Sequence, residues 1–153
     1  MAASQQFCTF MLHEEFFGVP VQQVQEVIRY QEMTRVPLGS EMVSGLINLR
    51  GQIVTAIDLR RCLGMPARGA RQLPMNVVVR TGDGPVSLLV DDIGDVIEVD
   101  EDALEAPPET LHGPTRVMVR SVYKLPGQLL LELDIARAIA VAEAAKESPL
   151  SRA

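Results

Sequence analysis

The sequence predicts a mainly β protein made of small, closed or nearly closed barrels. Short apolar runs recur along most of its 153 residues, and turn-forming residues separate them at regular intervals. Helical patterns are brief, so the strand–helix alternation of a parallel sheet is missing. The length suits about one domain with a modest core. The strands fall into two groups of similar rhythm, before and after a loop at 66–74, without a clear repeat.

A hairpin is predicted at the start of the chain, where β-favouring runs at 7–12 and 16–19 flank a polar trio. After Pro20 the spacing becomes helical, which predicts a short amphipathic helix over 21–29 with Pro20 in its first turn. The apolar stripe of this helix consists of Val21, Val24, Val27 and Ile28. Such a stripe usually packs on the protein's own core, but it can also receive a partner helix.

A second hairpin is predicted from two strands at 46–49 and 53–57. Arg50-Gly51-Gln52 joins them, and Gly51 can adopt the positive φ of a tight turn. An arginine at a hairpin tip is usually solvated, although its guanidinium can also pair with a carboxylate and fix the turn. Asp58 is suited to cap a short helix over 59–63.

The loop 66–74 has prolines, a glycine and two arginines but few apolar residues, which predicts a mobile surface loop. Strands are then predicted at 76–80 and 86–90, around a turn rich in glycine and proline. A third short strand is predicted at 95–99. The prolines between residues 100 and 114 interrupt the strand pattern.

The last hairpin is predicted to join 116–125 and 128–133 across a Pro-Gly turn. Alternation along its second strand puts Leu129, Leu131 and Leu133 on one face and Glu132 on the other. An Ala-rich helix over 134–147 follows, with Asp134 suited to cap it. The apolar residues at helical spacing are Ile135, Ile139 and Ala142.

The formal charge is −6, from 14 basic and 20 acidic residues. This argues against a nucleic-acid-binding protein, because binding phosphates needs a clustered basic surface. Residues 81–115 contain no Lys or Arg and hold half of the acidic residues, whereas only arginines supply the basic residues before them. The asymmetry predicts an acidic side and an Arg-bearing side, an arrangement that orients protein partners.

No secretory or membrane-spanning segment is predicted. The N-terminus lacks the basic flank and apolar core of a signal peptide, and no apolar run approaches the roughly 20 residues of a membrane helix. Cys8 and Cys62 are too few for a disulfide framework or a Cys-rich zinc site, and both are predicted to be small buried hydrophobes. These features fit a cytoplasmic protein in a reducing compartment.

Patterns for catalysis and metal binding are weak. His13 and His112 are the only histidines, and without a nucleophile motif both are predicted to lie on the surface. Asp91, Asp92 and Asp95 suggest a Mg²⁺ or Ca²⁺ site or a small carboxylate enzyme, but the spacing of a calcium-binding loop fails and a solvated strand end is the favoured interpretation. We therefore predict no catalytic residue, no metal and no cofactor.

The most distinctive motif runs over 43–54, is centred on Asn48-Leu49-Arg50-Gly51, and continues at 56–60. Four further stretches accompany it in order, at 7–19, 21–28, 89–96 and 123–135. Together these residues resemble the CheW family, the bacterial chemotaxis coupling proteins, over about residues 5–140. The chain departs from the family at Ser121, where Gly is usual, and in the loop 66–74.

The resemblance implies two five-stranded SH3-like barrels side by side, with short helices, a C-terminal helix and no enzymatic activity. It implies a single CheW-like domain over 5–147, made of two β-barrel subdomains, and a tail at 148–153. Because the sequence ends at Ala153, a fused receiver domain is not expected.

The resemblance further implies an adaptor that couples the cytoplasmic tip of a chemoreceptor to the regulatory domain of the histidine kinase CheA, and so controls the kinase by scaffolding. The alternative is a CheW-like coupling protein of a non-flagellar pathway that controls pilus motility or cyclic-dinucleotide output. Either protein is expected to be a monomer in isolation and part of large arrays, with neither membrane insertion nor nucleic-acid binding.

Matching positions carry over the expected contacts. An apolar groove between the barrels is expected to hold the receptor helix. The residues expected to bind the receptor are Val24, Glu26, Val27, Ile28 and Arg50. The residues expected to bind the kinase are Met33, Thr34, Arg35, Leu46, Asn48 and Gly51. We also expect an ion pair between Glu26 and Arg50 that ties the predicted helix to the hairpin.

Overall fold

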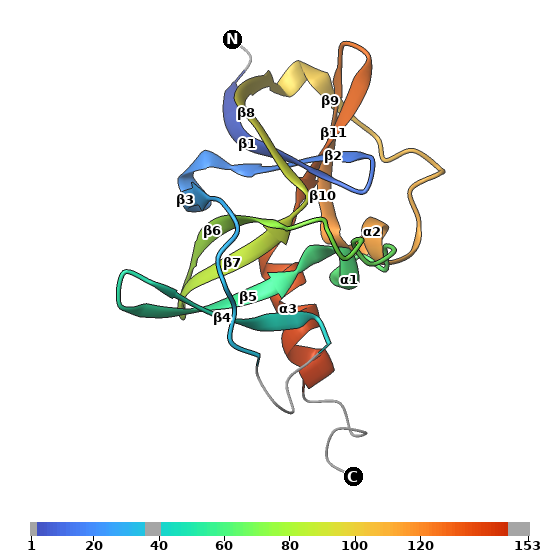
Figure 1. Ribbon diagram of the computed structural model, residues 1–153. Coiled ribbons are helices and arrows are strands. Elements are labelled where there is room, and N and C mark those ends of the chain that lie inside the picture. Colours follow the sequence, from blue (N-terminus) through green and yellow to red (C-terminus); the bar gives the residue numbers. More distant parts are fainter. Residues whose placement is uncertain (1–2, 36–40, 147–153) are drawn as a thin grey trace.

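The strands of the protein form two sheets, which occupy the upper and lower parts of the computed structural model in Figure 1. The structure describes residues 3–35 and 41–146, so the predicted tail at 148–153 lies outside the described residues. The six-stranded sheet has, in order, β8 (Asp92–Asp100), β1 (Ser4–Leu12), β2 (Glu15–Pro20), β11 (Gln128–Leu133), β10 (Val119–Leu125) and β9 (Leu104–Glu105). The five-stranded sheet has, in order, β3 (Val24–Ile28), β6 (Met75–Thr81), β7 (Gly84–Val90), β5 (Gln52–Asp58) and β4 (Val43–Leu49).

The helices are short apart from one at the end of the described chain. They are η1 (Val21–Gln23), α1 (Leu59–Cys62), η2 (Glu101–Ala103), α2 (Gly113–Met118) and α3 (Ile135–Lys146). The Asp58 carboxylate accepts a hydrogen bond from the Arg60 N–H at the start of α1, and Asp134 does the same for the Arg137 N–H in α3. Both predicted helix caps are therefore confirmed.

The mainly β fold with two sheets, short helices and a C-terminal helix is confirmed, and so are the hairpins β1–β2, β4–β5, β6–β7 and β10–β11. One sheet has a sixth strand, the two-residue β9. In the part of the chain that the structure describes, the pairing in each sheet runs from one edge strand to the other without closing a ring. Within the described residues, the edge strands of each sheet are therefore not joined by a continuous backbone ladder.

Sequence order does not map onto the sheets. β1 and β2, from the start of the chain, pair with β8 and β11 from its second half, and β2 lies parallel to β11. The five-stranded sheet is instead built from the middle of the chain, β3 to β7. The two strand groups separated by the loop 66–74 are thus not the two sheets, because pairing follows apolar faces that meet only in three dimensions.

The predicted helix over 21–29 is wrong. Only Val21–Gln23 are helical, as the single turn η1, and residues from Val24 onward form β3, which pairs antiparallel with β6. Three of the four stripe residues lie in this strand, where β-branched side chains pack well but lose freedom in a helix. A register shift between Val24 and Glu26 disturbs the twofold alternation, which explains why the spacing resembled a helix.

The strand predicted to begin at residue 116 begins at Val119 instead. The preceding residues form α2, with Pro114 in its first turn, where a missing N–H and a fixed φ are favourable. This turn buries Met118 in the core.

One apolar core serves both sheets. The six-stranded sheet contributes Phe10, Leu12, Phe17 and Val19, and the five-stranded sheet contributes Val77, Val79, Leu88 and Val90. Helix α1 adds Leu59 and Cys62, and α3 adds Ile135, Ala138 and Ala142. A smaller cluster of Phe7, Val99 and Leu130 lies within the six-stranded sheet. Cys62 is a buried hydrophobe as predicted, and burial raises the pKa of its thiol to about 12, whereas Cys8 is half-buried.

Both faces of β11 are buried. Leu131 and Leu133 face the shared core, and Leu130 faces the smaller cluster on the opposite side. By alternation Glu132 lies on the side of Leu130, as predicted, but it is only 4% exposed. Burial raises the pKa of the Glu132 carboxyl, and the charge of Asp134 acts in the same direction against Arg120 and a Ser121 hydrogen bond. Folding therefore shifts the protonation equilibrium of this carboxyl toward its neutral form, relative to the unfolded chain.

Replacing Glu132 with an amide should stabilise the protein at neutral pH. The native pKa lies above the unfolded value of about 4.3, so the wild-type free energy of unfolding should fall as pH rises through this interval and then level off. Glu132→Gln should abolish that fall and raise the free energy of unfolding at pH 7, because the amide carries no charge into the buried site. Urea unfolding between pH 4 and 8 measures both effects. The exposed Glu105→Gln is the control, and equal stability of Glu132→Gln and wild type at pH 7 would contradict the prediction.

Candidate functional site

The tip of the β4–β5 hairpin is a tight turn with two residues in the left-handed region. Gly51 has φ 85°, as predicted, and Arg50 has φ 55°. The Gly51 N–H donates to Asn48 Oδ1 at 2.9 Å, which holds the turn from within the hairpin. This local geometry sends the Arg50 side chain away from the strand ladder toward another part of the sheet.

The guanidinium of Arg50 forms the ion pair with Glu26 that the sequence analysis expects. Nη1 lies 2.8 Å from Oε2 and Nη2 lies 2.9 Å from Oε1, a bidentate arrangement. Glu26 is in β3, at one edge of the five-stranded sheet, whereas Arg50 directly follows β4, which lies at the other edge. The pair therefore bridges the two sheet edges, although the Arg50 side chain is 76% exposed and solvent screens it.

Two exposed apolar residues neighbour the paired residues along the chain, although by alternation Val27 projects from the opposite side of β3 to Glu26. Val27 is exposed on β3, and Ile53 on β5 is 61% exposed, next to the turn. We call Glu26, Val27, Arg50 and Ile53 the hairpin surface. Val24 and Ile28 are only half-buried and accessible in part, and Val24 packs against the shared core, so the predicted receptor residues do not share one face. Sequence reasoning missed Ile53, although alternation with the buried Val54 and Ala56 would have placed it outward.

Thr34, which follows β3 in the chain, is hydrogen-bonded through its backbone to β4. The Thr34 N–H donates to the Leu46 carbonyl and the Leu46 N–H to the Thr34 carbonyl, both at 2.8 Å. Gly45 permits this approach, because a Cβ there would lie 2.6 Å from the Thr34 oxygen. The sequence-predicted kinase contacts Thr34 and Leu46 therefore meet through their backbones.

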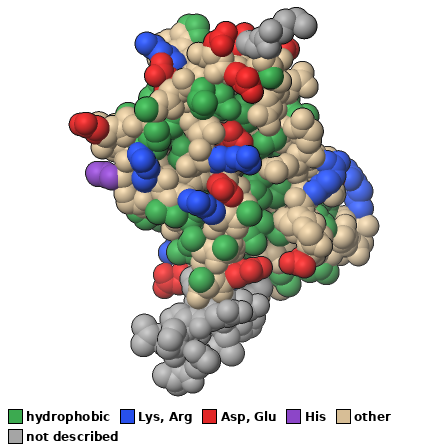
Figure 2. Space-filling view, turned by 180° about the vertical axis from the view of Figure 1, so that it is seen from behind, with side chains coloured by type: hydrophobic (Ala, Val, Ile, Leu, Met, Phe, Trp, Pro, Cys, Tyr) green, Lys and Arg blue, Asp and Glu red, His purple; other side chains and the backbone are tan. Residues whose placement is uncertain are grey.

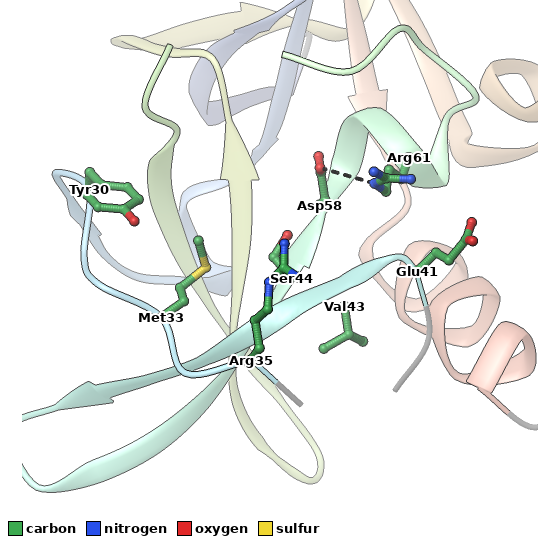
Figure 3. Close-up of a pocket in the computed structure, with 8 residues that line it drawn as sticks. All are labelled: Tyr30, Met33, Arg35, Glu41, Val43, Ser44, Asp58 and Arg61. Carbon is green, nitrogen blue, oxygen red and sulfur yellow. Dashed lines mark ion pairs between the residues drawn. The ribbon is translucent and has the colours of Figure 1, made fainter. Parts of the chain in front are cut away.

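A groove of about 580 Å³ opens beside this bridge (Figure 3). Its lining residues are Tyr30, Met33, Arg35, Glu41, Val43, Ser44, Asp58 and Arg61. Met33 and Arg35 were predicted for kinase contact, and both lie along this groove, whereas Asn48 and Gly51 belong to the hairpin turn. Sequence reasoning missed the remaining lining residues, which come from segments that only the fold brings together.

A buried cluster of ion pairs lies between the two sheets. Asp91 is bound by Arg60 and by Arg68, and Arg68 also binds Asp58 at 2.9 Å. Burial acts to raise the pKa of Asp91, but hydrogen bonds from Arg60 and the His13 N–H, with the charges of Arg68 and Arg60, hold it below the usual value. The hydrogen bond to Asp91 in turn raises the pKa of Arg60. Both members of this pair stay charged at neutral pH.

This cluster corrects two predictions. Asp91 is not part of a solvated strand end, and the loop 66–74 is anchored through Arg68, whose side chain is 8% exposed. Asp92 and Asp95 are exposed and take no part in the cluster. Within residues 3–35 and 41–146, no three metal-binding side chains come together. The three aspartates thus do not converge on a common point, as a carboxylate enzyme or a metal site would require.

Acidic and basic side chains are interspersed on the face shown in Figure 2. Asp and Glu side chains appear at its top, centre and lower part, and Lys and Arg lie among them, most of them across the middle. A simple division into an acidic and a basic half, as the sequence predicts, is not seen on this face. His13 and His112 are exposed, as predicted. None of the helices in the described ranges is both long and apolar enough to span a membrane.

Comparison with known proteins gives consistent matches. The family model described as CheW-like domain matches residues 6–143. Chemotaxis protein CheW of Bacillus subtilis is 32% identical over 125 residues, covering 82% of this chain and 80% of the relative. The CheW of Treponema pallidum is 27% identical over 134 residues, covering 85% and 79%. The crystal structure of the scaffolding protein TtCheW from Thermoanaerobacter tengcongensis aligns with a TM-score of 0.77 and 28% identity, covering 87% and 90%.

A double-mutant cycle should detect the bridge between the sheet edges. Glu26→Ala, Arg50→Ala and the double variant should give a coupling of about 0.5–1 kcal/mol in the free energy of unfolding, because the pair is bidentate but largely exposed. Urea unfolding at low salt is the measurement, and 1 M NaCl should reduce the coupling. Additive single variants at low salt would show that the pair contributes nothing.

Adding a methyl group at position 45 should detach the segment around Thr34. Gly45→Ala forces a Cβ against the Thr34 carbonyl and should cost about 1–3 kcal/mol, the range for overpacked sites. The Thr34 amide should also exchange its hydrogen faster. Gly69→Ala is the matched control, since a Cβ there meets nothing within 4 Å. Equal stability of the two variants would refute the close contact.

Proposed function

The chain belongs to the CheW family, and we propose that it is a non-catalytic adaptor that couples a chemoreceptor to the kinase CheA in a chemotaxis array. The observation that carries this proposal is the family match over residues 6–143, which spans both sheets apart from the first two residues of β1. The names of the relatives point to chemotaxis. No observation favours the non-flagellar alternative.

We assign the receptor contact to the hairpin surface. An amphipathic helix binds through apolar side chains, and the exposed Val27 and Ile53 offer such a contact. The Glu26–Arg50 pair beside them supplies charged groups that orient the helix more than they add affinity. The half-buried Val24 and Ile28 support this surface from within β3 rather than forming its outer face.

We assign the kinase contact to the groove around Met33 and Arg35. The groove combines an apolar side chain, an aromatic ring and charges of both signs, a composition typical of protein interfaces. Thr34 and Leu46 hold its wall in place through their backbone bridge. Asn48 and Gly51 are hydrogen-bonded to each other in the hairpin turn. We therefore expect them to influence kinase binding through the conformation of this turn.

Strand β4 connects the two surfaces: its first residue, Val43, lines the groove, and Arg50 follows its last residue. A receptor and a kinase bound to one rigid strand are held at a defined spacing and at a high effective concentration. This mechanism makes and breaks no covalent bond. We propose that the protein works in the cytoplasm, as a monomer when isolated and within large arrays when assembled.

Substitutions in one proposed surface should weaken binding of one partner and leave binding of the other unchanged. Val27→Asp and Ile53→Asp place a charge in the proposed receptor contact and should weaken co-sedimentation with a receptor tip roughly tenfold or more, as a lost hot spot does. Binding of the CheA regulatory domain should not change in these variants. Arg35→Glu should have the reverse effect, weakening kinase binding while leaving receptor binding intact.

The control for these variants is Leu73→Asp, because Leu73 is also an exposed apolar residue but lies outside both surfaces. It should bind both partners as the wild type does. Failure of the wild type to bind either partner would overturn the proposed function. Equal loss of both partners in Val27→Asp would overturn the assignment of separate surfaces.

A further inference from the structure

The chain crosses between the two sheets only twice in its described part. It passes once from β2 through η1 to β3, and once from β7 to β8. The second crossing is a single residue, Asp91. The angle between the sheets at this crossing therefore depends on the backbone of Asp91 and on whatever holds it.

Both sheets hold Asp91. From the six-stranded sheet, the His13 N–H in the β1–β2 turn donates to Asp91 Oδ2 at 2.6 Å, and the Asp91 N–H donates to the Met11 carbonyl at 3.0 Å. From the side of the five-stranded sheet, Arg60 Nε donates to Oδ1 at 2.9 Å and Nη2 to Oδ2 at 2.5 Å. The carboxylate is thus the point where polar contacts from the two sheets meet.

Arg68 adds a second fastening, from a loop that forms no regular structure. Its Nε donates to Asp91 Oδ1 at 2.8 Å, its Nη1 to Asp58 Oδ1 at 2.9 Å and its Nη2 to the Leu89 carbonyl at 3.1 Å. All three nitrogens donate hydrogen bonds, to the end of β5 at Asp58, to β7 at Leu89 and to the crossing residue Asp91. Arg60 fastens the same loop by donating from Nη1 to the Pro66 carbonyl at 2.9 Å.

We propose that the loop 66–74 is a latch. In this latch, Arg68 is the positioning residue that holds the two sheets at one angle where the chain crosses between them at Asp91. The shared apolar core also joins the sheets, but apolar contact is non-directional, whereas a planar guanidinium binding two carboxylates is directional. Anything that lifts this loop, whose Arg71 and Leu73 are exposed, would free Asp91 and Asp58 from Arg68 together. This inference does not rest on the proposed function.

The test compares Arg68→Gln with Arg71→Gln, a matched change of an exposed arginine in the same loop. Spin labels at Lys124→Cys on β10 and Gln25→Cys on β3, both exposed positions on different sheets, report the distance between sheets in a Cys8→Ser background. Arg68→Gln should broaden this distance distribution, and the His13 amide should exchange roughly tenfold faster, since local opening raises exchange at the affected site alone. Arg71→Gln should change neither measurement.

Amides in the β6–β7 hairpin distinguish a latch from a general stabiliser. If Arg68→Gln leaves their exchange unchanged while the His13 amide accelerates, the latch is supported. If all amides accelerate together, or if the distance distribution stays as narrow as in the wild type, the inference is overturned. Arg68→Lys keeps the charge but loses the planar fork, and a wild-type distance distribution in this variant would likewise overturn the directional role of the guanidinium.

Discussion

Apolar side chains from both sheets meet in one core, and the other contacts of the protein are arranged around it. Phe10 and Phe17 stack with ring centroids 5.9 Å apart, and valines and leucines of β6 and β7 join the same core. Helices α1 and α3 add their apolar residues to it. Because each sheet contributes its apolar face to a common core, neither would keep that face from water by itself.

Polar contacts around this core fix the positions of the sheet edges and of the crossing between the sheets. Apolar contact holds the sheets together without selecting an angle or a position for their edges. The Asp91 cluster supplies directional contacts at the crossing, Glu26 and Arg50 bridge the open edges of the five-stranded sheet, and Gly45 lets the Thr34 segment approach β4. Each of these three contacts lies beside a proposed binding surface or at the crossing between the sheets. They therefore help to set the relative positions of the surfaces that an adaptor needs.

An adaptor of this kind requires a defined shape, and paired buried charges help to hold the shape of this protein. The buried side chains of Arg60, Arg68 and Asp91 are paired with one another. Exposed apolar residues are found on β3, at Val27, and just after the hairpin turn, at Ile53. Glu132 differs from the paired residues, since it is a buried carboxyl without an ion-pair partner within 4 Å in the described chain, and burial raises its pKa.

Local signals in the sequence determined the hairpins, the caps Asp58 and Asp134, the Gly51 turn and the helix α3, because each depends on residues close in the chain. The central motif and the four accompanying stretches also indicated the family, and the positions matched to that family gave the expected Glu26–Arg50 pair. Only the tertiary structure decided that Val24–Ile28 form a strand, since β-branched residues at that spacing suit either form until β6 pairs with them. It alone decided the interleaving of the sheets and the burial of Asp91, because the partners, Arg60, Arg68 and the His13 amide, lie far away in sequence.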